Sequence, residues 1–282
     1  MRRAGWAAAI QLGFAFAAAV PASAQTGAAT DLPAMLSRLI AAYPAQLERI
    51  DGNALVWKDG TRMPIDDGKG VKDHEVRLAT SDIKDMFFTP YVAGKISSPP
   101  ARTEDPGRAR NVAFFDKVYG DCKAGGVSGK LVEVVWLPKK WGKPLKISSV
   151  NGAAAKLAAV SAELDALPAR FDPFLTPPAG TYNCRPIAGT TRLSAHGHGI
   201  AIDISTAHAH YWRWSGGKTS GGEATGSKPP GGNTGAVIPY KNSIPPEIVE
   251  IFERHGFIWG GKWYHYDTMH FEYRPELLPP AR

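Results

Sequence analysis

The segment SAHGHGIAIDI, residues 194–204, decides the expected fold. If residues 199–204 form a β-strand, successive side chains point to opposite faces of the sheet. The three isoleucines of the segment then face a hydrophobic core, while Asp203 shares the other face with one glycine and one alanine. A carboxylate in that position is costly to bury unless it is paired or binds a cation. We therefore expect a strand that holds Asp203 over a polar site, with His196 folding back over the same face.

A second segment, WGGKWYHYDTMHFEY at residues 259–273, has the same kind of alternation. A strand that begins near Met269 sends its two aromatic residues to the core and places His270 and Glu272 on the opposite, polar face. Asp267 lies in the turn that enters this strand. From there its carboxylate can lie beside a metal ion without binding it directly.

Together the two segments, Ser-x-His-x-x-x-x-x-x-Asp and Asp-x-x-His-Phe-Glu, resemble the zinc family of D-alanyl-D-alanine carboxypeptidases and L-alanyl-D-glutamate endopeptidases. The fold of that family is shared with the hedgehog signalling domain. The resemblance covers about residues 150–282, and the paired motifs are specific together although either alone is weak. It implies that His196, Asp203 and His270 bind one zinc ion (Zn2+) per chain and that Asp267 is the general base.

The family also carries an arginine ahead of the first histidine, which helps to hold the substrate carbonyl. The sequence TYNCR at residues 181–185 resembles the context of that arginine. However, the spacing from Arg185 to His196 is shorter than in the better-known members. Arg192 is the competing candidate, and the choice between the two arginines stays open at this point.

The resemblance implies hydrolysis of peptide bonds in the stem peptides of peptidoglycan. Two histidines and one carboxylate leave zinc an open position for water, whose pKa the metal lowers toward about 7. Asp267 then takes a proton and passes it to the leaving amine, while Arg185 stabilises the oxyanion. Ser194, Glu272 and Tyr266 are expected to bind substrate or to support the metal ligands, for example by fixing a histidine tautomer.

Two questions about function stay open in the sequence. Carboxypeptidase and endopeptidase activities share this metal core, so the motifs do not separate them. The alternative to an enzyme is a non-catalytic, zinc-containing module for cell-wall binding or signalling. A degenerate member would be expected to lose the base or a ligand, and because Asp267 and all three ligand positions are filled, we favour the enzyme.

The N-terminus has the pattern of a secretory signal peptide over residues 1–24. Arg2 and Arg3 precede a short apolar run, which ends at the small residues Ala22-Ser23-Ala24. The run is too short for a membrane-spanning helix, which needs about 20 apolar residues. We expect export to the periplasm or the medium and no stable membrane insertion after cleavage of the signal.

Composition narrows the class of partner and of metal site. Only Cys122 and Cys184 are present, so a disulfide between them is the simplest expectation in an oxidising compartment, and a thiolate zinc site is excluded. The net charge of +7 comes from scattered residues and includes no basic run. The sequence therefore predicts no nucleic-acid binding, whereas the charge suits peptidoglycan, a polymer with free carboxylates.

The expected fold class is α+β: a small antiparallel sheet with flanking helices in a zinc peptidase domain at 150–282, plus an N-terminal α/β extension at 25–149. The extension has no motif that we can attach to chemistry. The following elements are predicted: a helix from Asp31, strands around 55–57, a buried strand at 131–137, a helix at 151–167, a helix from Pro245-Pro246, and a rim loop at 214–236.

The other histidines are expected to lie outside the metal centre. His198 is two residues from His196, yet it falls where the family tolerates several residue types. His208 and His210 are expected at the rim of the site. We interpret His74 and His255 as ordinary surface or helix-end histidines.

Overall fold

The computed structural model describes Met1, residues 31–215 and residues 238–279. The predicted signal peptide and most of the predicted rim loop lie outside the described residues. The described helices are α1 (Leu32–Ala42), α2 (His74–Ala79), α3 (Val112–Tyr119), α4 (Ala153–Asp165), α5 (Asp172–Leu175), α6 (Trp212–Ser215) and α7 (Pro246–Arg254). The described strands are β1 (Leu47–Asp51), β2 (Ala54–Trp57), β3 (Arg62–Pro64), β4 (Leu131–Trp136), β5 (Lys143–Ser148), β6 (Ala201–Asp203), β7 (Phe257–Trp259) and β8 (His270–Tyr273).

The two signature segments meet in one antiparallel sheet of order β6-β8-β7. Its register pairs Asp203 directly with His270 and Ala201 with Glu272. Because side chains alternate along a strand, these four residues share one face of the sheet. The expected strands and their polar face are therefore present, and the protein is a mixed α and β structure with small antiparallel sheets, as predicted at this level.

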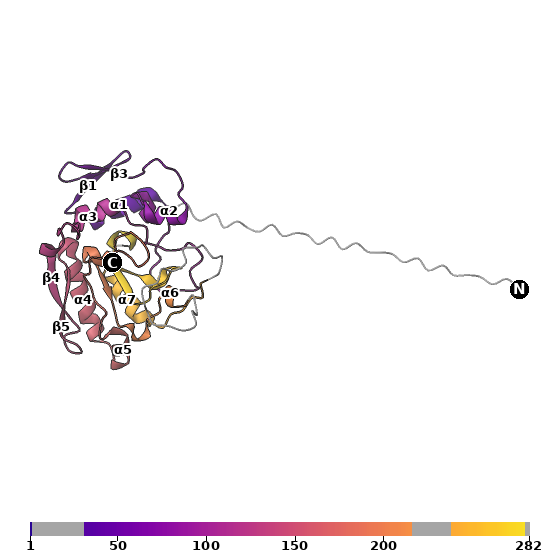
Figure 1. Ribbon diagram of the computed structural model, residues 1–282, viewed down its shortest axis with the longest axis vertical. Helices are drawn as coiled ribbons and strands as arrows, with labels where there is room; N and C mark the ends of the chain where they lie inside the picture. The colour runs from indigo at the N-terminus through magenta and orange to yellow at the C-terminus, as the bar shows by residue number, and fades with distance from the viewer. Residues whose placement is uncertain (2–30, 216–237, 280–282) are drawn as a thin grey trace.

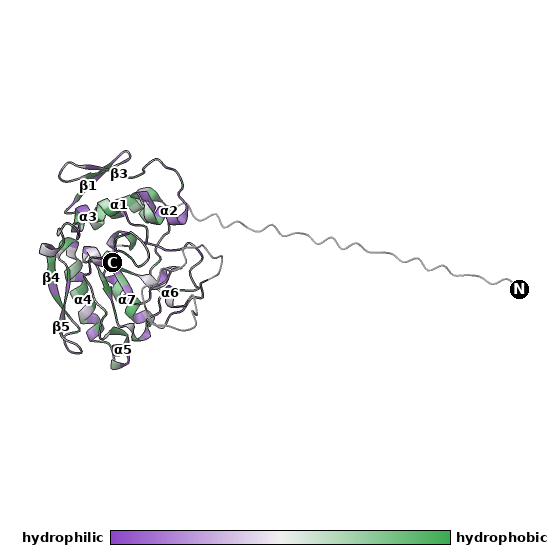
Figure 2. Cartoon of the chain, viewed as in Figure 1, coloured by the Kyte–Doolittle hydropathy of each residue, from purple (hydrophilic) through white to green (hydrophobic). Residues whose placement is uncertain are grey.

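The opposite face of this sheet packs on helix α7. The ring of Phe252 stacks on that of Phe271 with centroids 3.8 Å apart, and both side chains are fully buried. The helix begins at Pro246, where a missing N–H costs nothing, and Gly256 follows its end at a φ of +87°. Helices α4 and α7 each carry hydrophobic and hydrophilic residues (Figure 2). The predicted amphipathic helices at 151–167 and from Pro245-Pro246 are therefore confirmed.

Strands β4 and β5 form a separate two-stranded hairpin beside α4 (Figure 1). The predicted strand at 131–137 is present as β4, but the prediction that this strand is buried is wrong in part. Val132 and Val135 are 41% and 47% exposed, whereas Val134 and Trp136 are buried. The reason is that only one face of this hairpin packs on the rest of the molecule, so a run of apolar residues does not by itself indicate burial on both sides.

The N-terminal part of the chain shares its hydrophobic core with the C-terminal part. Buried residues from α1 through β8 belong to one continuous cluster. Tyr43, which follows α1, donates its hydroxyl to Glu276 at 2.9 Å, and Asn151 donates to the carbonyl of Ala42 at 2.9 Å. Figure 1 places α1, α2 and α3 between the β1–β3 sheet and the remainder of the molecule. The signature strands are thus held in part by residues 31–149.

The predicted disulfide between Cys122 and Cys184 is present and joins the two parts of the chain. Among residues 31–215 and 238–279, no helix has the length and apolar character needed to cross a membrane.

Candidate metal centre

His196, Asp203 and His270 converge on one point. Asp203 Oδ1 lies 2.9 Å from His270 Nδ1 and 3.2 Å from His196 Nε2, and the two ring nitrogens are 3.2 Å apart. Tetrahedral zinc with bonds of about 2.0–2.1 Å has neighbouring ligand atoms roughly 3.3 Å apart. The three donor atoms therefore fit a single zinc ion in both type and spacing.

The short 3₁₀ helix Ala195–His198 positions His196. Ser194 caps this helix, because its hydroxyl accepts the backbone N–H of His196 at 3.4 Å. Gly199 ends the helix in the left-handed region at a φ of +66°, which returns the chain into β6. His196 Nδ1 contacts the carbonyl of Thr181 and so carries the proton, which leaves the lone pair on Nε2, the atom that faces the other two ligands.

Glu272 orients His270 in a similar way. Its Oε2 lies 3.2 Å from His270 Nε2, and its carboxylate also accepts from Arg110 at 2.8 Å and Arg274 at 3.0 Å. Burial alone would raise the pKa of Glu272, but Arg110, His270 and Arg274 hold this pKa well below its usual range. An ionised Glu272 accepts a hydrogen bond from the Nε2–H of His270, so Nδ1 presents its lone pair to the candidate metal position.

Two carboxylates, those of Asp203 and Glu272, flank His270. Burial would lower the pKa of His270, yet hydrogen bonds and charge from Asp203 and Glu272 raise it to about 10. Asp203 is half-buried; desolvation would raise its pKa, but His196 and His270 hold this pKa below its usual range. A field that stabilises one positive charge on an imidazole stabilises a divalent cation more strongly.

Asp267 lies in the turn that enters β8, and its backbone carbonyl accepts the N–H of His270 at 3.2 Å. Burial and the neighbouring charge of Asp203 raise the pKa of Asp267 to about 7, against the opposing effects of His270 and His196. Its Oδ1 is shielded from solvent and makes no hydrogen bond with the described residues. Buried carboxylates with a raised pKa and an unused oxygen are typical of general bases.

Residues 188–273 match a family model described as D-alanyl-D-alanine carboxypeptidase. This match includes His196, Asp203, Asp267 and His270, the residues whose side chains converge. Over this segment, which is less than a third of the chain, the sequence is therefore similar to that carboxypeptidase family. Searches of curated proteins and of solved structures find no significant match.

The two candidate arginines differ in their surroundings: Arg185 lies just before the matched segment, and Arg192 lies inside it. Arg185 is exposed, and its side chain makes no hydrogen bond or ion pair with the described residues. Arg192 is half-buried in a hollow that it lines with Arg108, Arg110 and His198. Burial, followed by the charges of Arg108 and Arg110, lowers the pKa of Arg192 to about 9. Arg110 is paired with Glu272 and Arg108 with Asp105, so among these three only Arg192 has no carboxylate partner in the described part of the chain, and its guanidinium group could pair with an anion in this hollow.

The other residues predicted near the site, Tyr266 and His198, have hydrogen-bond partners outside the three converging side chains. Tyr266 is buried, donates its hydroxyl to the carbonyl of Pro239 at 3.0 Å and packs against Tyr240, so the contact that orients His270 comes from Glu272. His198 Nε2 pairs with Asp116 at 2.9 Å, which directs this ring toward α3.

Arg108 and Arg110 were not anticipated from the sequence. Arg110 contacts Glu272 behind the metal ligands, and Arg108 lies 5.5 Å from the centroid of Trp263, whose ring is 5.5 Å from that of His270. Both arginines come from a stretch without a motif. Only long-range packing, which single-sequence patterns do not report, brings them to the site.

Proposed function

We propose that this protein is a zinc metallopeptidase of the hedgehog/DD-peptidase fold, with one catalytic zinc, that hydrolyses peptide bonds in peptidoglycan stem peptides. The observation that carries the proposal is the convergence of three zinc-type donor atoms beside Asp267, a half-buried carboxylate whose pKa is raised to about 7. A structural zinc site would use a fourth protein ligand instead of a neighbouring base.

His196, Asp203 and His270 would hold the zinc ion. When bound, zinc supplies a Lewis acid that polarises the scissile carbonyl and acidifies a water molecule. Asp267 accepts the proton of the attacking water and delivers it to the nitrogen of the leaving group. Burial favours the protonated form of Asp267 and so helps it to take the proton, whereas a bound dication would favour its release to the leaving group.

The arginines around the hollow would orient the substrate. Arg192 and Arg108 offer positive charge to the developing oxyanion or to a carboxylate of the stem peptide. We propose Arg192 for this role ahead of Arg185, since Arg192 is the one that lines the hollow. Both a terminal D-alanine carboxylate and an internal D-glutamate carboxylate fit this charge, so both cleavage types remain within the proposal.

We further propose that the protein acts in the periplasm or outside the cell. Residues 1–24 have the pattern of a cleaved signal, the peptidoglycan substrate lies in that compartment, and the disulfide suits an oxidising environment.

Replacement of Asp267 tests the mechanism. We expect Asp267→Asn to lower kcat for cleavage of purified muropeptides by about 10²–10⁴-fold, the usual contribution of a general base. The zinc that depends on His196 should remain bound, because Asp267 is not a ligand. Turnover at the wild-type rate would contradict the mechanism, and absence of cleavage by the wild-type chain would favour the non-catalytic alternative.

The same base predicts a pH dependence. Asp267 must be ionised to act, so kcat/KM falls as pH falls through its pKa, between the ordinary 3.8 and about 7. A bound dication stabilises the carboxylate and moves this acid limb toward the lower end. Asp267→Asn should remove the limb from the residual activity.

A further inference from the structure

A second group of two histidines and one aspartate lies outside the proposed catalytic centre. His74 begins α2, Asp105 lies in the loop before α3, and His265 lies two residues before Asp267. Donor atoms of the three side chains lie within 4.8 Å of one another. We propose that His74, Asp105 and His265 form a second metal site, which takes zinc or a similar divalent transition metal.

The carboxylate of Asp105 is arranged as a metal ligand would be. Its Oδ2 faces both rings, at 2.7 Å from His265 Nδ1 and 3.0 Å from His74 Nε2. Its Oδ1 accepts the backbone N–H of His265 at 3.0 Å and Arg108 Nη1 at 3.3 Å. One oxygen thus points to the shared position while hydrogen bonds fix the other, as is usual for carboxylates that bind metals. The three donor atoms lie within 4.8 Å of one another, and a bound tetrahedral zinc would draw them to a spacing of about 3.3 Å.

The orientation of His74 supports an ion at this position. Its Nε2 is shielded from solvent and makes no hydrogen bond with the described residues, although Asp105 Oδ2 is only 3.0 Å away. The ring therefore does not aim its nitrogen at that oxygen. Its plane lies 20° from that of His265, with centroids 5.9 Å apart, so both rings approach Asp105 side by side. The two histidine side chains are 14% and 19% exposed, which leaves a path for an ion from solvent.

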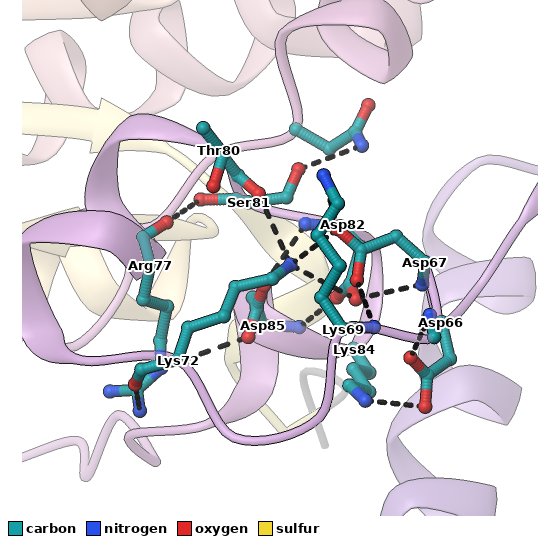
Figure 3. A network of polar contacts seen from close by, with 12 residues as sticks. Asp66, Asp67, Lys69, Lys72, Arg77, Thr80, Ser81, Asp82, Lys84 and Asp85 are labelled. Carbon is teal, nitrogen blue, oxygen red and sulfur yellow. Dashed lines mark hydrogen bonds and ion pairs between the residues drawn. The ribbon is translucent and has the colours of Figure 1, made fainter.

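A third cluster of possible metal ligands, made of aspartates alone, differs from the His74 group because its charge is already balanced. Asp66, Asp67 and Asp82 also lie close together, but a buried lysine already supplies their cation (Figure 3). Lys72 Nζ lies 2.9 Å from Asp67, 3.3 Å from Asp82 and 2.6 Å from Asp85. At the His74 group, the neighbouring cation Arg108 lies against the other oxygen of Asp105, so the space between the two rings and Oδ2 stays available to a metal.

A metal at this site would connect the two parts of the chain. His74 and Asp105 belong to the N-terminal region, whereas His265 belongs to the connection between β7 and β8 that carries Asp267. The ion would anchor that connection at a point two residues from the proposed base. This gives residues 31–149 a specific part in the metal chemistry of the protein.

Counting bound zinc in the untagged, full-length chain tests the second site. After equilibration with Zn2+ and removal of free ion, elemental analysis should find about two zinc ions in the wild type, one for each three-ligand set. His74→Ala and His265→Gln should each lose one ion, as should His196→Ala, and His74→Ala/His196→Ala should lose both. His255→Ala, which removes a surface histidine paired with Glu163, is the matched control and should keep both.

Two further outcomes separate this inference from the proposed function. A single ion that is lost in His196→Ala and kept in His74→Ala overturns the second site and leaves the peptidase proposal intact. A single ion that is lost in His74→Ala and kept in His196→Ala supports the second site and contradicts the catalytic one. Circular dichroism verifies that each variant is folded, and the melting temperature of His196→Ala should rise with added Zn2+ while that of the double variant should not.

Discussion

Glu272 links the proposed metal ligands to the packing of the molecule. Its carboxylate is completely buried and contacts His270, Arg110 and Arg274 at the same time. Removing its charge would leave two buried guanidinium groups less well compensated and His270 without its acceptor.

We therefore expect Glu272→Gln to lower the free energy of unfolding by about 3 kcal/mol, measured by urea denaturation, because a buried ion pair loses one partner. Zinc affinity should fall by about 10–100-fold, the usual effect of losing such a support. Glu163→Gln is the matched control: that carboxylate is 42% exposed in its pair with Arg254, so its loss should cost about 0–1 kcal/mol. Equal losses in the two variants would argue against the role of Glu272.

For single residues, the sequence predicted which side chains form the candidate site better than it predicted which residues surround them. Alternation in residues 199–204 indicates that Asp203 faces away from the isoleucines, because this depends only on the period of a strand. Arg110 could not be found in this way, since its contact with Glu272 depends on packing between distant segments. His74 was interpreted as an ordinary histidine for the same reason. Its neighbours in the fold, Asp105 and His265, are distant from it in sequence.

Among the elements, the connection between β7 and β8 depends on close backbone contact. Gly260 accepts the N–H of Asp267 through its carbonyl at 3.0 Å. A Cβ added at Gly260 would lie 2.6 Å from the carbonyl oxygen of Asp267 and 3.0 Å from the ring of Trp263. A side chain at Gly260 must therefore displace the backbone that carries the proposed base.

Gly260→Ala should thus lower kcat by about 100-fold, because a shift of about 1 Å at a catalytic group has an effect of that size. Gly129→Ala is the matched control, as an added Cβ there meets no atom within 4 Å. Steady-state kinetics on the same muropeptides measures both variants. Equal kcat values for Gly260→Ala and Gly129→Ala would show that the contact does not position Asp267.

Helices were predicted correctly where the sequence has both a periodic apolar pattern and residues that mark the ends of the helix. The helix from Pro246 has an apolar face, a proline at its start and a glycine after its end, and each of these is local. The strand at 131–137 has only apolar character, and its burial depends on a second layer that covers one face alone. The residues of the strand itself do not indicate whether such a layer is present.

On the scale of the whole molecule, the site is built by both parts of the chain. Residues 188–273, which match the carboxypeptidase model, supply the three proposed metal ligands and the proposed base. The N-terminal region supplies Arg108 and Arg110 and shares the hydrophobic core. The Cys122–Cys184 disulfide links the two parts of the chain. It lies next to the segment that leads to His196, in which Pro186 and Leu193 form an antiparallel bridge. Residues 31–215 and 238–279 therefore share one hydrophobic core and together build the proposed site.

The most direct measurement follows the mass of products from a defined muropeptide incubated with the full-length chain. We expect loss of a terminal D-alanine or cleavage within the stem peptide by the zinc-loaded protein, no cleavage after chelation, and recovery when Zn2+ is returned. His196→Ala should remain inactive with added Zn2+. Cleavage at an unchanged rate by the chelated protein or by His196→Ala would contradict the claim that the His196, Asp203 and His270 centre performs hydrolysis.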